Sequence, residues 1–263
     1  MGHGPRMWVR LGLVIGMLAG AGLSGCDSKT GDDQTAQETG DAAPEQGMTE
    51  GAAVAVDQRQ SPEDFQRAAL AQRSAGMESQ AIDTLNTALG LHPDHAGLLS
   101  LRGSLHLEQG RPAVALTDLN AAAARQPDHP PTLINRAQAQ KQLNNVTQAL
   151  TDLDRVVAKH PDLMPARFNR GAIHFEQKRF KEALADFDHA IVLDPNTPAL
   201  YYNRALTLDA LGERNGARAD LERLLAMNAD EALQQQARDR LEQWGDGNRS
   251  GGQEKSKEAN RPR

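Results

Sequence analysis

Residues 168–196 read FNRGAIHFEQKRFKEALADFDHAIVLDPN, and the fold of this chain follows from the pattern that they contain. Its small residues Gly171 and Ala183, the large apolar Phe187 and the closing Pro195 have counterparts at intervals of 34 residues. Five units follow one another without a gap: 62–95, 96–129, 130–163, 164–197 and 198–231. No single unit can bury an apolar face alone, so a repeat of this length predicts units that stack on one another.

Four positions, counted from the first residue of each unit, carry the pattern. Position 8 is small: Ala69, Gly103, Ala137, Gly171, Ala205. Position 20 is alanine: Ala81, Ala115, Ala149, Ala183, Ala217. Position 24 is large and apolar: Leu85, Leu119, Leu153, Phe187, Leu221. Position 32 is proline in four units, with Ala229 in the fifth: Pro93, Pro127, Pro161, Pro195. Small residues let two antiparallel helices approach closely, position 24 fills the space beside them, and the proline ends the second helix.

This pattern resembles the tetratricopeptide repeat over 170 residues. The resemblance implies an all-α fold, a right-handed superhelix (α-solenoid) of five helix-turn-helix units. Leu233, Ala237, Leu241 and Trp244 then form one apolar stripe at helical spacing, which predicts a capping helix over 232–244. Gly245 is expected to end that helix, and the polar, Gly-rich residues 245–263 are expected to be a disordered tail.

The N-terminal segment predicts a signal peptide and attachment to a membrane. Two arginines precede an uncharged apolar run over 11–23, which is too short to span a bilayer. Leu23-Ser24-Gly25-Cys26 resembles the lipobox of bacterial lipoproteins, and it implies a signal peptide over 1–25 and acyl chains on Cys26. The alternative is a soluble protein with an incidental cysteine. Residues 26–61 are acidic and lack apolar periodicity, so they are predicted to be a disordered tether.

Two further positions covary among the units. Position 7 is arginine and position 23 is aspartate in units two to five, whereas the first unit has Ala68 and Thr84 instead. Because both partners are lost together, structural ion pairs are predicted within a unit or between neighbouring units. The residues are Arg102, Asp118, Arg136, Asp152, Arg170, Asp186, Arg204 and Asp220. The competing interpretation, an anion-binding ladder, would require the aspartates to be absent.

The resemblance also implies a concave groove lined by the first helix of each unit. Position 6 supplies three amides, which both donate and accept hydrogen bonds and so suit the backbone of an extended partner: Asn135, Asn169 and Asn203. The alternative is that each amide bonds a neighbouring helix. Positions 5 and 12 add Phe168, Phe175, Tyr202 and Lys141, and the aromatic rings are predicted either to anchor a partner side chain or to complete the core.

Composition and motifs narrow the function. A net charge of −6 disfavours a nucleic-acid binder, and a single cysteine excludes a disulfide framework. No metal-ligand spacing, phosphate loop or nucleophile elbow is present, so no enzyme activity, cofactor or metal is predicted. The resemblance implies a lipid-anchored, periplasm-facing scaffold that binds other envelope proteins. Asp27 resembles the enteric signal for retention in the inner membrane. The alternatives are a pilotin-like assembly factor for a type IV pilus or secretin and a peptidoglycan- or glycan-binding module.

Overall fold

A computed structural model describes residues 61–258, with side chains through residue 245. The predicted signal peptide, Cys26 and nearly all of the predicted tether lie outside the described residues. Within them the chain forms eleven α-helices and no strand. They divide into two compact bodies, residues 61–93 and residues 94–258, and each is described by itself.

The first body is a single helix pair, α1 (Pro62–Ser74) and α2 (Glu78–Leu91). Helix α1 begins with a capping box. The Ser61 hydroxyl accepts a hydrogen bond from the Asp64 amide, and the Asp64 carboxylate accepts one from the Ser61 amide. Thr84 Oγ1 donates to Gln72 Oε1 over 2.9 Å. This neutral hydrogen bond links the two helices of the one unit that lacks the arginine and aspartate.

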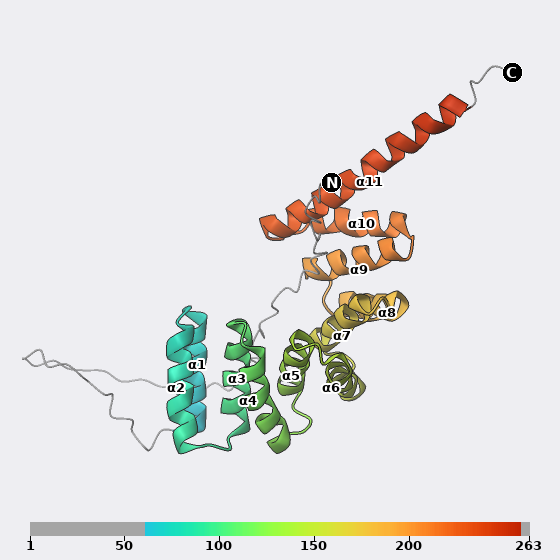
Figure 1. The fold of residues 1–263 in the computed structure, drawn as a ribbon. Coiled ribbons are helices and arrows are strands. Elements are labelled where there is room, and N and C mark those ends of the chain that lie inside the picture. Colours follow the sequence, from blue (N-terminus) through green and yellow to red (C-terminus); the bar gives the residue numbers. More distant parts are fainter. Residues whose placement is uncertain (1–60, 259–263) are drawn as a thin grey trace, which may run out of the picture. The chain divides into compact units, whose positions relative to one another are not determined.

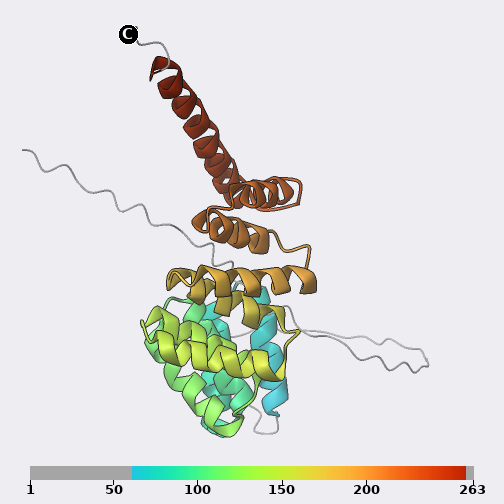
Figure 2. The ribbon, with the colours of Figure 1, turned by 90° about the vertical axis from the view of Figure 1, so that its right-hand side faces the viewer.

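The second body contains four helix pairs and a final helix (Figure 1). The helices are α3 (Ala96–Glu108), α4 (Pro112–Arg125), α5 (Pro130–Gln142), α6 (Val146–Lys159), α7 (Met164–Glu176), α8 (Phe180–Leu193), α9 (Pro198–Ala210), α10 (Arg214–Leu225) and α11 (Glu231–Glu258). The first helix of each pair begins 34 residues after its predecessor, as the repeat predicts. Figure 2 shows α7–α8 and α9–α10 as successive layers, with the second helix of each pair packed against the first helix of the next.

The residues at the recurring positions of the repeat lie inside the helix pairs. Every residue at positions 8, 20 and 24 is buried. A Cβ atom built on Gly103 would lie 2.7 Å from Leu119 Cγ, and one on Gly171 would lie 3.0 Å from Phe187 Cε1. These two glycines therefore allow the helices of their pairs to approach more closely than alanine would.

The turn inside each pair uses one left-handed residue at position 15. Its φ angle is +68° at Gly110, +63° at Asn144, +60° at Lys178 and +83° at Gly212. In the fourth unit the Lys178 amide then donates to the carbonyl of Phe175, and the next amide donates to the carbonyl of His174. These bonds satisfy carbonyl groups that the end of a helix would otherwise leave without partners.

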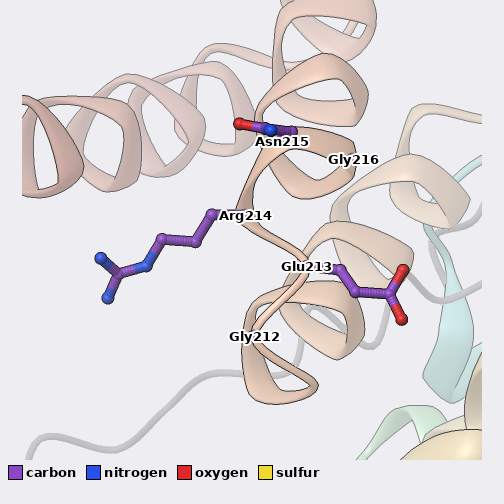
Figure 3. A pocket seen from close by; sticks show the side chains of 5 residues that line it. All are labelled: Gly212, Glu213, Arg214, Asn215 and Gly216. Atoms are coloured by element: carbon purple, nitrogen blue, oxygen red, sulfur yellow. The ribbon is translucent and has the colours of Figure 1, made fainter.

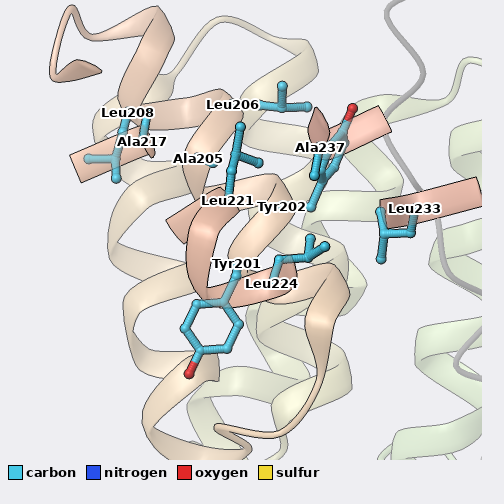
Figure 4. Close-up of a cluster of buried hydrophobic side chains, with 10 residues drawn as sticks. All are labelled: Tyr201, Tyr202, Ala205, Leu206, Leu208, Ala217, Leu221, Leu224, Leu233 and Ala237. Atoms are coloured by element: carbon cyan, nitrogen blue, oxygen red, sulfur yellow. The ribbon is translucent and has the colours of Figure 1, made fainter. Parts of the chain in front are cut away.

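Helix α11 closes the last pair. The Leu233 amide donates to the Asp230 carboxylate over 2.9 Å, which caps the helix. Leu233 and Ala237 pack into a cluster with residues of α9 and α10, including Tyr202 (Figure 4). The prediction that Gly245 ends this helix was wrong, because α11 continues to Glu258. Gly245 does not adopt a positive φ angle, and a glycine inside a helix costs only about 1 kcal/mol relative to alanine.

Candidate partner-binding surface

Five polar residues share one side of the neighbouring helices α5 and α7. They are Asn135, Gln138 and Lys141 on α5, and Asn169 and Glu176 on α7, and they are here called the polar face. The spacing of three residues along α5 brings its three side chains onto one side of the helix. All except the exposed Glu176 are half-buried, so the polar face offers polar atoms on a partly shielded surface.

An ion pair joins the two helices of the polar face. Lys141 Nζ lies 2.8 Å from Glu176 Oε1. The lysine predicted to line the groove is therefore held by a carboxylate of the next unit. This pair links α5 to α7 and leaves little net charge on the polar face.

The three position-6 asparagines are not equivalent. Among the described residues, neither Asn135 nor its neighbour Gln138 makes a side-chain hydrogen bond. Asn169 is half-buried, and its Nδ2 donates to the Pro165 carbonyl of its own helix over 2.8 Å. Asn203 is 0% exposed, and its Nδ2 donates to the Ala199 carbonyl over 2.9 Å. Only the first two amides are accessible to a partner, and the prediction for Asn203 is corrected.

The predicted aromatic anchor pocket is also corrected. Phe168 is 2% exposed, and its ring lies 6.1 Å from that of Phe187. Tyr202 is 5% exposed and belongs to the cluster that α11 covers. Phe175 is half-buried, with its ring edge-on to Phe180 at 5.4 Å. The rings complete the packing of the last two units, which was the alternative interpretation.

The position-7 arginines each bind the position-23 aspartate of their own unit through two hydrogen bonds. The Nε and Nη2 distances to the two carboxylate oxygens are 2.7 and 2.7 Å for Arg102–Asp118, 2.8 and 2.6 Å for Arg136–Asp152, 2.9 and 2.7 Å for Arg170–Asp186, and 2.7 and 2.6 Å for Arg204–Asp220. This bidentate geometry is specific to arginine. The aspartates neutralise the arginines, so this row of residues is not an anion-binding ladder.

A second contact, which was not predicted from the sequence, joins neighbouring units. Arg170 Nη1 donates to Asp154 of α6 over 2.9 Å, and the equivalent atom of Arg136 reaches Asn120 of α4 over 3.5 Å. Hydrogen bonding to Asp186 is the main cause that raises the pKa of Arg170 above its ordinary value. Position 25 carried the signal for this contact, because it holds a polar residue wherever the next unit has the arginine.

Two open cavities of about 370 Å³ lie on the second body. One follows the turn from Gly212 to Gly216, where the side chains of Glu213 and Arg214 leave in opposite directions (Figure 3). The other lies between α6, α7 and α8, and the side chains around it form the ion pairs of Arg170 and Arg179.

In the part of the chain that the structure describes, no group of three or more potential ligands could hold a metal ion. No helix in that part has the length and apolar character needed to cross a bilayer.

The stacked pairs and their polar face define a helical-repeat protein. Family models of the tetratricopeptide repeat match residues 67–130, 134–198 and 170–242, and the chain belongs to that family. This fold is that of a protein–protein interaction scaffold.

Solved structures agree with this assignment. The chain is similar to a thermophilic tetratricopeptide-repeat protein of Thermus thermophilus, with 20% identity, a TM-score of 0.60 and coverage of 69% of this chain and 99% of that one. A tetratricopeptide-repeat protein of Parabacteroides merdae shows 24% identity, a TM-score of 0.59 and coverage of 70% and 72%. MamA of Desulfovibrio magneticus shows 15% identity, a TM-score of 0.57 and coverage of 65% and 95%. No curated protein matches the sequence. The similarities establish the fold.

Proposed function

We propose that this chain is a lipid-anchored scaffold of the bacterial envelope that binds a segment of a partner protein on its polar face. The observation that carries this proposal is the state of Asn135 and Gln138. Both side chains are half-buried, and neither is satisfied by a hydrogen bond within the described residues. Partly shielded amides that have no hydrogen-bond partner within the chain are suited to form hydrogen bonds with another protein.

The same residues favour an extended partner over a helical one. An amide side chain pairs with one backbone N–H and one backbone carbonyl, and an extended segment presents both. A partner helix satisfies its backbone groups internally and needs apolar anchor sites instead. Phe168 and Tyr202, which the sequence offered as such sites, are buried. The partner segment therefore binds through its backbone, with side chains that tolerate a polar surface.

The location rests on the N-terminal sequence. The lipobox-like residues 23–26 support acylation of Cys26, and several acyl chains give long-lived attachment to a bilayer. The polar residues up to 61 then hold the helical repeats away from the lipid. Asp27 favours the inner membrane, with the repeats facing the periplasm. The pilotin-like alternative requires residence in the outer membrane, and a glycan-binding module requires exposed aromatic platforms.

A crosslinking experiment in the native host tests the surface. A photo-crosslinking residue replaces Gln138 in the full-length chain, and the matched control replaces the exposed Thr151 on α6 of the same unit. We expect capture from position 138 only, and loss of that capture when Asn135→Ala and Asn169→Ala are combined. Neither residue is in the core, so the fold should persist, which circular dichroism checks. Equal capture from both positions, or capture that survives the double substitution, contradicts binding at the polar face.

The anchor is tested separately. Cys26→Ala should move the protein from the membrane fraction to the soluble fraction. Retention in the membrane fraction would contradict the anchor and leave the proposal for the polar face intact.

A further inference from the structure

Alternate helix pairs of the second body contain a buried histidine. His106 of α3 and His174 of α7 both occupy position 11 and are only 6% and 7% exposed. The equivalent residues in units three and five are Gln140 and Leu208. Position 16 varies in step, because it is Arg111 and Arg179 where position 11 is histidine, but Asn145 and Glu213 in units three and five.

Each histidine lies among arginines and carboxylates. His106 is influenced by Arg102 of its own helix, Arg111 of the turn and Asp118 of α4. Around His174 are Arg170 and Arg167 of α7, Arg179 of the turn, Glu182 and Asp186 of α8, and Asp154 of α6. The carboxylates are occupied, since Asp118 and Asp186 bind the position-7 arginines, Asp154 binds Arg170 and Glu182 binds Arg179. A proton on either histidine would therefore add a positive charge beside arginines, where each of these carboxylates is already paired with an arginine.

The hydrogen bonding of the two histidines also disfavours their protonation. The Nδ1 atoms of His106 and His174 are buried and have no hydrogen-bond partner. A neutral imidazole can carry its proton on the other nitrogen, but an imidazolium ion has N–H groups on both. Protonation would thus create a buried donor without an acceptor. His174 also lines the cavity between α6, α7 and α8, which gives solvent protons a route to this part of the body.

We propose that the pairs α3–α4 and α7–α8 are acid-sensitive joints, which open under mild acid while the pair α9–α10 stays closed. Burial is the main cause that lowers the pKa of both histidines below the ordinary value of 6.5. Above that value the ring is neutral in folded and unfolded chains alike, so it contributes no pH dependence. As the pH falls below 6.5 the unfolded chain binds a proton that the folded chain does not, and stability is lost down to the folded pKa. Carboxylates with lowered pKa values titrate only in more acidic solution.

Hydrogen exchange of the full-length chain tests this proposal. Exchange of α4, α8 and α10 amides is compared at about pH 7.5 and about pH 5.5, after correction for intrinsic exchange rates. The pair α9–α10 contains no histidine and is the internal reference. We expect the opening equilibrium of α4 and α8 to rise relative to α10 by at most about tenfold for each histidine, because pH 5.5 lies one unit below the ordinary histidine pKa of 6.5.

Two substitutions assign the effect to particular residues. His174→Gln should abolish the acid response of α8 and leave that of α4, whereas His106→Gln should reduce that of α4 and leave that of α8. Any acid response that remains in α4 is then due to His129, which follows this helix and whose pKa is also lowered by burial. Glutamine already occupies this position in units one and three, as Gln72 and Gln140, so both variants should fold. An acid response of equal size in α10, or a response of α8 that persists in His174→Gln, would overturn the proposal.

Discussion

Arg204 Nη1 lies 2.8 Å from Asp188 Oδ1, so an arginine of α9 reaches back to the helix that precedes it. The other nitrogens of the same guanidinium hold Asp220 of α10. One side chain therefore connects three helices and fixes both the geometry of its own pair and the position of the previous one. Its two carboxylate partners differ in burial, since the Asp220 side chain is 7% exposed and that of Asp188 is 52% exposed.

Removing the buried carboxylate should cost more than removing the exposed one. Asp220→Asn leaves a largely buried guanidinium without its main counterion, and we expect the free energy of unfolding to fall by about 3 kcal/mol. Asp188→Asn is the matched control, and its expected cost is below about 1 kcal/mol because solvent screens the pair. Urea denaturation of both variants measures the difference. Equal losses would mean that the two contacts contribute alike.

Gly103→Ala should destabilise the α3–α4 pair although alanine is the better helix former. The added methyl group would lie 2.7 Å from Leu119 Cγ, so the helices must move apart, at a cost of about 1–3 kcal/mol. Gly90→Ala is the control, because no atom lies within 4 Å of the new group and the helix propensity should give a small gain. Thermal unfolding of both variants compares the effects, and a stabilising Gly103→Ala would show that the close approach is not required.

Lys178→Gly should stabilise the protein by about 1 kcal/mol. Lys178 adopts a φ angle of +60°, which is unfavourable for a residue with a Cβ atom, and three other units have glycine at this position. The converse substitution Gly212→Ala, at a φ angle of +83°, should cost a similar amount. Chemical denaturation measures both changes. If Lys178→Gly has no effect, the turn must relax to a conformation other than the one observed.

The alkaline stability of the chain should depend on Tyr202. Burial raises the pKa of its phenol above the ordinary value of 10.0. Above pH 10 the unfolded chain loses a proton that the folded chain retains, so stability should fall as the pH rises through that range. Tyr202→Phe should remove this component, which tyrosinate absorbance and alkaline denaturation detect. An unchanged alkaline transition in the variant would contradict the assignment.

The repeat positions could be predicted from the sequence because each expresses a local constraint. Ala183 and Phe187 belong to a pattern that recurs at a fixed period, and the period alone fixes which side of each helix is buried. The pairing of Arg170 with Asp186 follows from the same logic, since both residues vary together among the units. Because the chain contains five copies of the unit, positions that vary together could be found by comparing the copies with one another.

The groove residues could not be predicted equally well. Asn169 and Asn203 occupy the same repeat position, but one is half-buried and the other lies in the core. The difference comes from what packs beside each unit, and the last pair is closed by α11 instead of another pair. The position in the repeat predicts which side of a helix a residue occupies. Whether that side is accessible depends on which helices pack beside the unit, and these differ at the end of the stack. Gly245 failed as a helix stop for a related reason, because a glycine permits a left-handed turn without requiring it.

The constant spacing of the helices has an evolutionary consequence. Arg170 contacts position 25 of the unit before it, and Asp154 at that position is supplied by residues 130–163. An in-frame duplication of this unit would place a second Asp154 before a second Arg136, so every contact between units would find a partner. Under the proposed function, each duplication would lengthen the surface that holds a partner segment by one helix pair, and the contacts between units would need no further change.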